Sequence, residues 1–226
     1  AWDRDGFFIT RELLTAEEVE LLGQIARADI RLRADASVRD DGEGRAVSLR
    51  VRNELEDDIY STISRSRRIV SVMEQLLGGE VYHYHHKLIF KDRQTAGAWA
   101  WHQDYGYWYD YACLYPLLAS CLIAVDPATR DNGCLQVLSG SHRMGRIEHG
   151  IKGDHGFPHL VPRPPEVTPL GLSRAGGGHA VLAGPVDALR VVLAAGTALI
   201  AHHVAGRQLK ATWLHEDPTD NPLRLS

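Results

Sequence analysis

The segment Trp101-His102-Gln103-Asp104 places an imidazole and a carboxylate two residues apart. In an extended chain, side chains at positions i and i+2 leave on the same face, so His102 and Asp104 can converge on one metal ion. A histidine from a later segment would complete the two-histidine, one-carboxylate set that binds Fe(II) in non-heme oxygenases. The spacing alone is common, and a hydrogen-bonded pair inside an aromatic core is the alternative interpretation.

The composition is that of a globular protein and narrows the range of partners. The chain has 226 residues, 44% of them hydrophobic and 24% charged, with a net charge of −4. This length predicts a single domain over residues 1–226. The charge balance predicts no nucleic-acid partner, and the apolar runs are too short to cross a membrane. The three cysteines form no CxxC pair and the first residues predict no signal peptide, so we expect a reduced, cytoplasmic setting.

The first third of the chain carries helix signals. Thr15 and Glu18 match a capping box, which predicts that a helix begins there. Apolar residues then recur at helical spacing along one face: Val19, Leu22, Ile25 and Ala26. A second helix is expected over residues 55–77, ended by Gly78-Gly79.

After Gly79 the hydrophobic period changes to two, which predicts strands. In the strand over 80–90 the alternation places His83, His85 and Lys87 on one face and His86 on the other, so the three histidines cannot bind one ion. Further strands are expected at five places: 115–125, 134–138, 188–194, 197–202 and 208–214.

Two connections carry their own predictions. Asn132-Gly133 lies between apolar segments at 123–125 and 135–137, which favours a tight hairpin turn. Residues 145–184 are rich in Gly, Pro and His and are expected to form a lid or binding loop. Helices followed by many short strands predict a mainly β fold with α decoration. We expect a jelly-roll (double-stranded β-helix, cupin-like) core over 80–214, packed with helices from 1–79.

The run from Trp101 to Trp108 resembles the metal-binding strand of the phytanoyl-CoA dioxygenase (PhyH) family of Fe(II)/2-oxoglutarate oxygenases. Residues 123–142 resemble the family stretch A-x-D-x-A-T-x-E-N-G-x-L-x-V-x-x-G-S-H, with Asp131 in place of the usual Glu. Residues 79–87 and the opening Asp5-Gly6-Phe7 also match, so the resemblance covers about residues 5–150 and resumes at 189–214. It implies Fe(II), 2-oxoglutarate and O₂ as cofactor and co-substrates.

The resemblance assigns roles to several residues. His102 and Asp104 correspond to iron ligands, and Lys87 corresponds to a lysine near 2-oxoglutarate. His142, in the Gly-Ser-His stretch, corresponds to a histidine that does not bind iron, so a structural hydrogen bond is expected there.

The last metal ligand departs from the family pattern. In the family a Gly-Asp-x-x-x-Phe-His strand is followed five residues later by the ligand histidine, and later by an arginine that binds the far carboxylate of 2-oxoglutarate. Residues 196–202 match that strand, but the ligand position falls on Arg207, which cannot coordinate a metal. A shortened hairpin would make His203, or else His202, the ligand and Arg207 the 2-oxoglutarate anchor.

An insertion would instead make His215 the ligand and Arg224 the anchor, which leaves only Leu225-Ser226 for a closing strand. We favour the shortened hairpin for that reason, and His203 over His202. A third alternative is that the ligand is absent and the protein is inactive.

The expected function follows from these residues. The resemblance implies an oxygenase that hydroxylates or otherwise oxidises an unactivated C–H bond and releases succinate and CO₂. The intact Asp104 favours hydroxylation over halogenation, and the lack of basic clusters favours a small metabolite or natural product over a CoA thioester. The alternative is a catalytically inactive PhyH-like jelly-roll binding protein. The expected partner is a small-molecule substrate, with no nucleic acid and no membrane.

Overall fold

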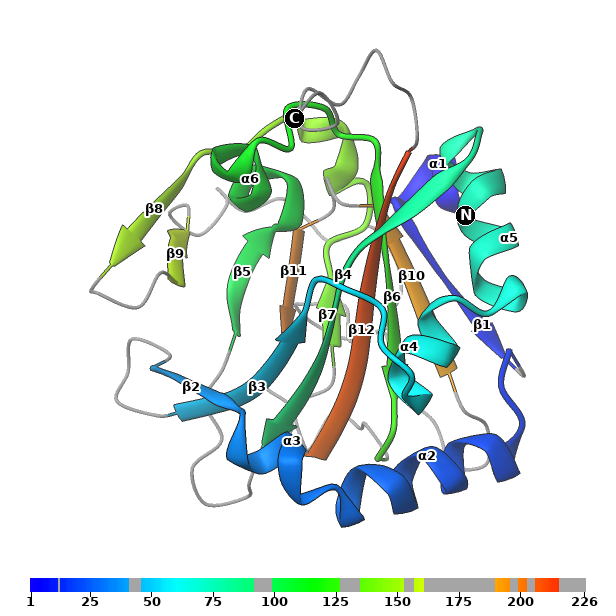
Figure 1. Ribbon diagram of the computed structural model, residues 1–226. Helices are drawn as coiled ribbons and strands as arrows, with labels where there is room; N and C mark the ends of the chain where they lie inside the picture. The colour runs from blue at the N-terminus through cyan, green and yellow to red at the C-terminus, as the bar shows by residue number, and fades with distance from the viewer. Residues whose placement is uncertain are drawn as a thin grey trace, which may run out of the picture.

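The computed structural model describes residues 1–11, 13–40, 46–91, 99–126, 135–152, 157–160, 190–195, 199–202 and 206–215. Its strands fall into two main sheets and one hairpin (Figure 1). The strands are β1 (Phe7–Arg11), β2 (Ser37–Asp40), β3 (Ala46–Arg52), β4 (Val81–Lys91), β5 (Trp99–Gln103), β6 (Leu118–Ala124), β7 (Leu135–Val137), β8 (His149–Lys152), β9 (Phe157–Leu160), β10 (Arg190–Ala195), β11 (Leu199–His202) and β12 (Gly206–His215).

The larger sheet has the order β1-β10-β6-β12-β4-β3-β2, and the smaller sheet has the order β5-β11-β7. Neighbouring strands pair antiparallel in both sheets. The sheets pack face to face, because Leu122 of β6 and Phe7 of β1 form an apolar cluster with Leu135 and Val137 of β7. This two-sheet antiparallel arrangement with helices confirms the predicted mainly β, jelly-roll fold.

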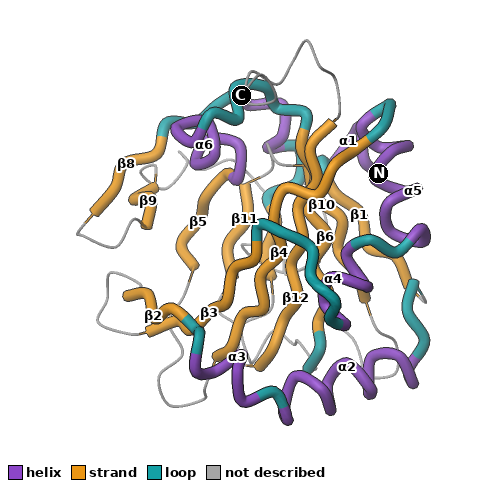
Figure 2. The backbone as a smooth tube through the Cα atoms, viewed as in Figure 1, coloured by secondary structure: helices purple, strands orange, loops and turns teal. Residues whose placement is uncertain are grey.

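Helices lie around the strands at the periphery of the molecule (Figure 2). They are α1 (Trp2–Asp5), α2 (Ala16–Ala28), α3 (Ile30–Ala34), α4 (Ile59–Ser64), α5 (Arg67–Leu77) and α6 (Asp104–Trp108), with short 3₁₀ turns η1 (Tyr109–Tyr111) and η2 (Ser141–Met144). In the described part of the chain, no helix is long and apolar enough to cross a membrane.

The two faces of the central strands differ in character. Leu209 and Ala211 of β12 pack with Cys121 and Ile123 of β6 in the main core, under helices α2, α4 and α5. The residues that alternate with these point to the opposite face, toward the smaller sheet, and include Leu122 and three polar side chains. Ser120, Lys210 and Thr212 are all buried there. The sequence of β12 therefore alternates apolar and polar residues, with the polar face turned inward.

Several local predictions are confirmed. Thr15 caps α2, and its side chain and that of Glu18 exchange hydrogen bonds with each other's backbone N–H. Leu22 and Ala26 are the fully buried part of that helix face. Gly78 ends α5 in the left-handed conformation, with φ of 81°.

Two predictions of local structure were wrong. The helix expected over 55–77 is two helices, because Asp58 caps the start of α4 and Ser66 adopts an extended conformation before α5. The hairpin expected between 123–125 and 135–137 does not form, because β6 and β7 belong to different sheets. Residues 132 and 133 lie outside the described residues, as do 161–189, so the single-domain assignment and the lid over 145–184 stay predictions.

Candidate active site

His102 and Asp104 meet at the end of β5, where the strand gives way to α6. Gln103 keeps the chain extended between them, with φ of −116° and ψ of 122°, so both side chains leave on the same face. His102 Nε2 lies 3.6 Å from Asp104 Oδ1, and both side chains are buried. The two metal ligands predicted from the spacing are thus brought together.

The second oxygen of Asp104 is held by the neighbouring sheet. Ser120 Oγ of β6 donates to Asp104 Oδ2 at 3.1 Å, and Lys210 Nζ of β12 donates to the same oxygen. The Ser120 hydroxyl also hydrogen-bonds the hydroxyl of Thr212, at 2.9 Å. Asp104 is therefore fixed through Oδ2, while Oδ1 faces His102.

Nearby positive charge keeps this carboxylate ionised. Burial works to raise the pKa of Asp104, but Lys210, His102 and Lys87 together outweigh it and hold that pKa well below its usual range. Lys87 of β4 lies directly opposite Lys210 of β12 in the strand register. The predicted co-substrate residue Lys87 therefore lies in the same electrostatic environment as Asp104.

The backbone of the His102–Asp104 segment is tied to residues 145–149. The Gln103 backbone N–H donates to His149 Nε2 at 3.0 Å, and His149 Nδ1 donates to the Ile147 carbonyl at 2.7 Å. The Gln103 side chain bonds the Gly145 carbonyl at 2.8 Å and the Ile147 N–H at 3.0 Å. Because the Gln103 N–H must donate, the neutral tautomer of His149 with hydrogen on Nδ1 is assigned.

His85 is a second buried histidine beside this site. Neither ring nitrogen has a hydrogen-bond partner among the described residues, and the ring packs against Trp108 at 4.8 Å and Tyr84 at 5.2 Å between centroids. Burial, followed by the charges of Lys87 and Lys210, lowers its pKa well below the usual value. The ring is therefore neutral at physiological pH.

The prediction that His83 shares a face with His85 was wrong. The β4–β12 register slips by one residue between Thr212 and Trp213, which leaves Tyr84 as an extra residue in β4 and turns His83 around. His83 Nε2 instead lies 3.1 Å from His86 Nδ1. The expectation that the three histidines do not share one ion agrees with this arrangement.

His142 has the structural role that was expected. Its Nε2 lies 3.1 Å from the Asp3 carbonyl, so it joins η2 to the N-terminal segment. Gly6 packs directly against this imidazole: a Cβ on Gly6 would lie 2.5 Å from His142 Nδ1. Glycine is therefore favoured at position 6 for two reasons, the close contact with His142 and the left-handed φ of 80°.

Of the other predicted site residues, two lie outside the described residues and three are described by their backbone alone. His203 and Arg224 lie outside the described residues. Positions 202, 207 and 215 are placed by their backbone: 202 lies opposite Trp99 in β5, 207 opposite Phe90 and 215 opposite Val81 in β4. Over the described ranges, no three His, Cys, Asp or Glu side chains form a cluster able to hold a metal.

The donors that are described fit a divalent metal ion. One imidazole and one ionised carboxylate oxygen converge from a single extended segment, and the other carboxylate oxygen is already hydrogen-bonded. Such outer contacts orient metal ligands in known metal sites. His102 and Asp104 would hold the metal, with a third donor from outside the described side chains.

Four residues that surround Asp104 and His102 were not predicted from the sequence: Gln103, Ser120, His149 and Lys210. A signal for Lys210 exists in the alternation of β12, where Gln208, Lys210 and Thr212 alternate with apolar residues. Such a pattern ordinarily indicates a strand with one face in water. In this fold the polar face is the interior of the site, which is why the pattern is misleading.

The chain is similar in sequence to a known family and to several characterised proteins. The family model for phytanoyl-CoA dioxygenase (PhyH) matches residues 2–169. The chain is 29% identical over 207 residues to L-proline trans-4-hydroxylase of Streptomyces griseoviridis, covering 89% of this chain and 75% of that protein. It is 34% identical over 150 residues to ectoine dioxygenase of Nocardia farcinica, covering 63% of this chain and 49% of that protein. It thus spans about half the length of this ectoine dioxygenase.

Solved structures share the fold. EctD from S. alaskensis, crystallised with 2-oxoglutarate and 5-hydroxyectoine, superposes with a TM-score of 0.67 at 19% identity, over 95% of this chain and 74% of that one. The α-ketoglutarate-dependent carbocyclase SnoK from nogalamycin biosynthesis has a TM-score of 0.67 at 15% identity, over 100% of this chain and 88% of that one. The match to the family model, which covers most of the chain, shows that it belongs to the phytanoyl-CoA dioxygenase (PhyH) family.

Proposed function

We propose that this protein is an Fe(II)/2-oxoglutarate-dependent hydroxylase acting on a small metabolite or natural product. The observation that carries the proposal is the buried pair of His102 Nε2 and Asp104 Oδ1, 3.6 Å apart at the end of β5. The names of the relatives support the reaction class, since they include a hydroxylase of L-proline and dioxygenases of ectoine. When bound, Fe(II) and 2-oxoglutarate supply O₂ activation coupled to oxidative decarboxylation of the 2-oxo acid.

The chain's own residues hold the reaction site rather than carry out the oxidation. His102 and Asp104 would hold the metal, and Ser120 and Lys210 keep Asp104 oriented and ionised. Lys87, opposite Lys210, supplies positive charge on the same face, which favours a dicarboxylate co-substrate.

For the third metal ligand we propose His203, with His202 and His215 as the alternatives. The support for His203 is the family strand pattern at residues 196–202, which His203 directly follows. In the antiparallel register of β11 with β5, Ile200 lies opposite His102 and position 202 opposite Trp99, so this ligand also requires the chain after β11 to turn back toward His102.

Arg207, near the start of β12, is the proposed anchor for the far carboxylate of 2-oxoglutarate. Position 207 is in step with Leu209 and Ala211 on the core face, so this role requires the strand to depart from regular alternation before Leu209. An arginine suits this task because it stays charged and binds a carboxylate with two hydrogen bonds.

The test is anaerobic addition of Fe(II) and 2-oxoglutarate to metal-free protein. Chelation of 2-oxoglutarate to the metal gives a weak visible charge-transfer band. We expect the band in the wild type, its loss in His102→Ala and His203→Ala, and its retention in His215→Ala. Arg207→Gln is expected to weaken binding of 2-oxoglutarate, so that the band appears only at higher 2-oxoglutarate concentration. Binding of Fe(II) should be unchanged.

The other outcomes distinguish the alternatives. Loss of the band in His215→Ala, but not in His203→Ala, would place the ligand at the end of β12. A folded wild-type protein without any band would contradict the oxygenase and support an inactive binding protein. Succinate release with L-proline or ectoine as trial substrates then tests the substrate class.

A further inference from the structure

The imidazole of His85 in β4 is buried without hydrogen bonds. The residue is 2% exposed, and neither Nδ1 nor Nε2 has a partner among the described residues. A neutral imidazole has one N–H donor and one acceptor nitrogen, so both groups are unsatisfied. Burying an unsatisfied polar group costs free energy, and such groups are rare in native interiors. His85 therefore weakens the fold by itself, which indicates a role other than stability.

His85 lies between two elements that also position Asp104. Thr212 of β12 is directly opposite His85 in the strand register, so the two side chains leave the sheet on the same face. The Thr212 hydroxyl bonds that of Ser120 at 2.9 Å, and Ser120 donates to Asp104 Oδ2 at 3.1 Å. The His85 ring also packs against Trp108, four residues after Asp104 in α6, with 4.8 Å between ring centroids. The imidazole is thus part of the surroundings of the metal site.

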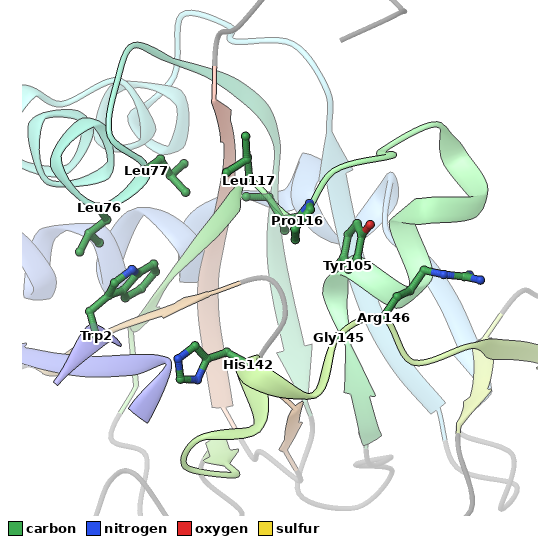
Figure 3. A pocket seen from close by; sticks show the side chains of 10 residues that line it. Trp2, Leu76, Leu77, Tyr105, Pro116, Leu117, His142, Gly145 and Arg146 are labelled. Carbon is green, nitrogen blue, oxygen red and sulfur yellow. The ribbon is translucent and has the colours of Figure 1, made fainter. Parts of the chain in front are cut away.

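A hollow of about 500 Å³ between the N-terminal helix, the end of α5 and the beginning of β6 does not reach this ring (Figure 3). Trp2 and Leu77 line one side of it and Tyr105 another, and the lining includes neither His85 nor Asp104. A ligand in that hollow would not contact the imidazole. The ring nitrogens are closed off from solvent, so a ligand at the metal site reaches them through a local movement of the side chains around the ring.

The charges around His85 favour an anionic partner. Lys87 lies two residues further along β4 and so on the same face, and Lys210 lies opposite Lys87 in β12. Burial, followed by the charges of these two lysines, holds the pKa of His85 well below its usual value. The imidazole therefore offers a neutral N–H beside cationic side chains. This arrangement is complementary to a carboxylate oxygen.

We propose that His85 donates a hydrogen bond to a carboxylate of the ligand that binds at the metal site. The carboxylate belongs either to 2-oxoglutarate or to a substrate of the amino-acid class, for which L-proline is the probe. This role rests on the proposed function, because that function brings a carboxylate to the metal. His85 would then be a recognition residue: it costs stability in the metal-free protein and gains its partner when the ligand binds.

The first measurement is the urea midpoint of the metal-free protein. His85→Leu and His85→Phe replace the unsatisfied imidazole by an apolar side chain, so we expect at least one of them to unfold at higher urea concentration than the wild type. His83→Leu is the matched control on the same strand. Because His83 Nε2 has His86 as a partner, this change should give no gain. Lower midpoints in both His85 variants would overturn the proposal, since His85 would then hold the fold.

The second measurement is calorimetry on protein loaded with Zn(II), a metal without redox chemistry. 2-Oxoglutarate is titrated first, and L-proline is then titrated into the 2-oxoglutarate complex. We expect His85→Leu to bind one of these carboxylates about tenfold more weakly than the wild type, as loss of a hydrogen bond to a charged group does. His85→Gln keeps an N–H donor and should recover part of the affinity, and His83→Leu should match the wild type. Weaker binding of 2-oxoglutarate assigns His85 to the co-substrate, and weaker binding of L-proline alone assigns it to the substrate.

Unchanged 2-oxoglutarate affinity in a folded His85→Leu protein, with L-proline binding either unchanged or absent from the wild type, would overturn the proposal. The charge-transfer band of the wild type with Fe(II) tests the proposed function separately. A band in the wild type together with no effect of the His85 changes contradicts the role of His85 alone. A missing band contradicts the proposed function, and the carboxylate assignment fails with it.

Discussion

Lys210 Nζ and Asp104 Oδ2 form a hydrogen-bonded ion pair between the two sheets, and 106 residues of chain separate them. The side chains are 2% and 8% exposed, so water screens the pair very little. Strand β12 thus does two things: its apolar face joins the main core, and its polar face supplies the charge that balances Asp104.

Lys210→Met is expected to destabilise the metal-free protein by about 3 kcal/mol at neutral pH, because it leaves the Asp104 carboxylate buried without its partner. Urea unfolding in the presence of a chelator measures the loss. The loss should shrink when a divalent metal such as Co(II) is added, since the metal then balances the carboxylate.

Asp104→Asn provides the control for this pair. In the Lys210→Met background it removes the uncompensated charge, so the double variant should be more stable than the sum of the two single changes predicts. Strictly additive losses would show that the ion pair contributes nothing to stability.

The fold was predictable where the signal is local. The capping box of Thr15 and Glu18 and the left-handed Gly78 depend on residues within one helical turn, and both are found as expected. The break between α4 and α5 was missed because the apolar positions continue across it, although Asp58 and Ser66 are residues that favour helix starts. The pairing of β6 and β7 with different sheets depends on distant strands and has no local signal.

The site, like the fold, was predictable where the signal lies within a few neighbouring residues. His102 and Asp104 were identified because their convergence needs only an extended chain between them. Ser120 and Lys210 complete the environment of Asp104 from two other strands, so their roles depend on sheet order. The altered face of His83 results from a one-residue bulge, which strict alternation cannot predict.

Gly106→Ala is expected to destabilise the protein by about 2 kcal/mol, a typical cost of overpacking. A Cβ at this position would lie 2.2 Å from the Ile147 carbonyl oxygen and 2.4 Å from the His149 ring. The segment 145–149 would have to move away from the Asp104 backbone. Thermal and urea unfolding measure the change.

Gly23→Ala is the matched control for this substitution. Gly23 lies in α2, and the nearest atoms to a new Cβ belong to the far end of the Arg27 side chain, which can move aside. Alanine stabilises a helix interior by up to about 1 kcal/mol relative to glycine, so this variant should be unchanged or more stable. An equal loss in both variants would contradict the packing explanation for Gly106.

Stability should fall as the pH is lowered from about 6.5 toward 4. Burial lowers the pKa of His83 from 6.5 to about 4, and it also lowers the pKa of His85, His86 and His149. In this range the unfolded chain takes up protons that the folded protein does not, so protonation favours unfolding. Urea midpoints measured across the range give the slope.

The double variant His83→Gln, His86→Gln separates this effect from general acid denaturation. It removes two of the four histidines while leaving the carboxylates unchanged, so its midpoint should fall less steeply between these pH values. A slope equal to that of the wild type would mean that these two histidines do not drive the acid sensitivity.

His149→Phe is expected to weaken binding of Co(II) to the His102–Asp104 pair about tenfold or more, as loss of an outer hydrogen bond does in other metal sites. The Gln103 backbone N–H, in a fully buried residue, would lose its acceptor, which should also cost about 1–3 kcal/mol of stability. His149→Gln keeps an acceptor and should restore part of both properties.

Absorption spectra during Co(II) titration measure the affinity of the metal site. His83→Gln, a change outside the site, should leave this affinity unaltered. Unchanged Co(II) affinity in a folded His149→Phe protein would show that residues 145–149 do not position the ligands.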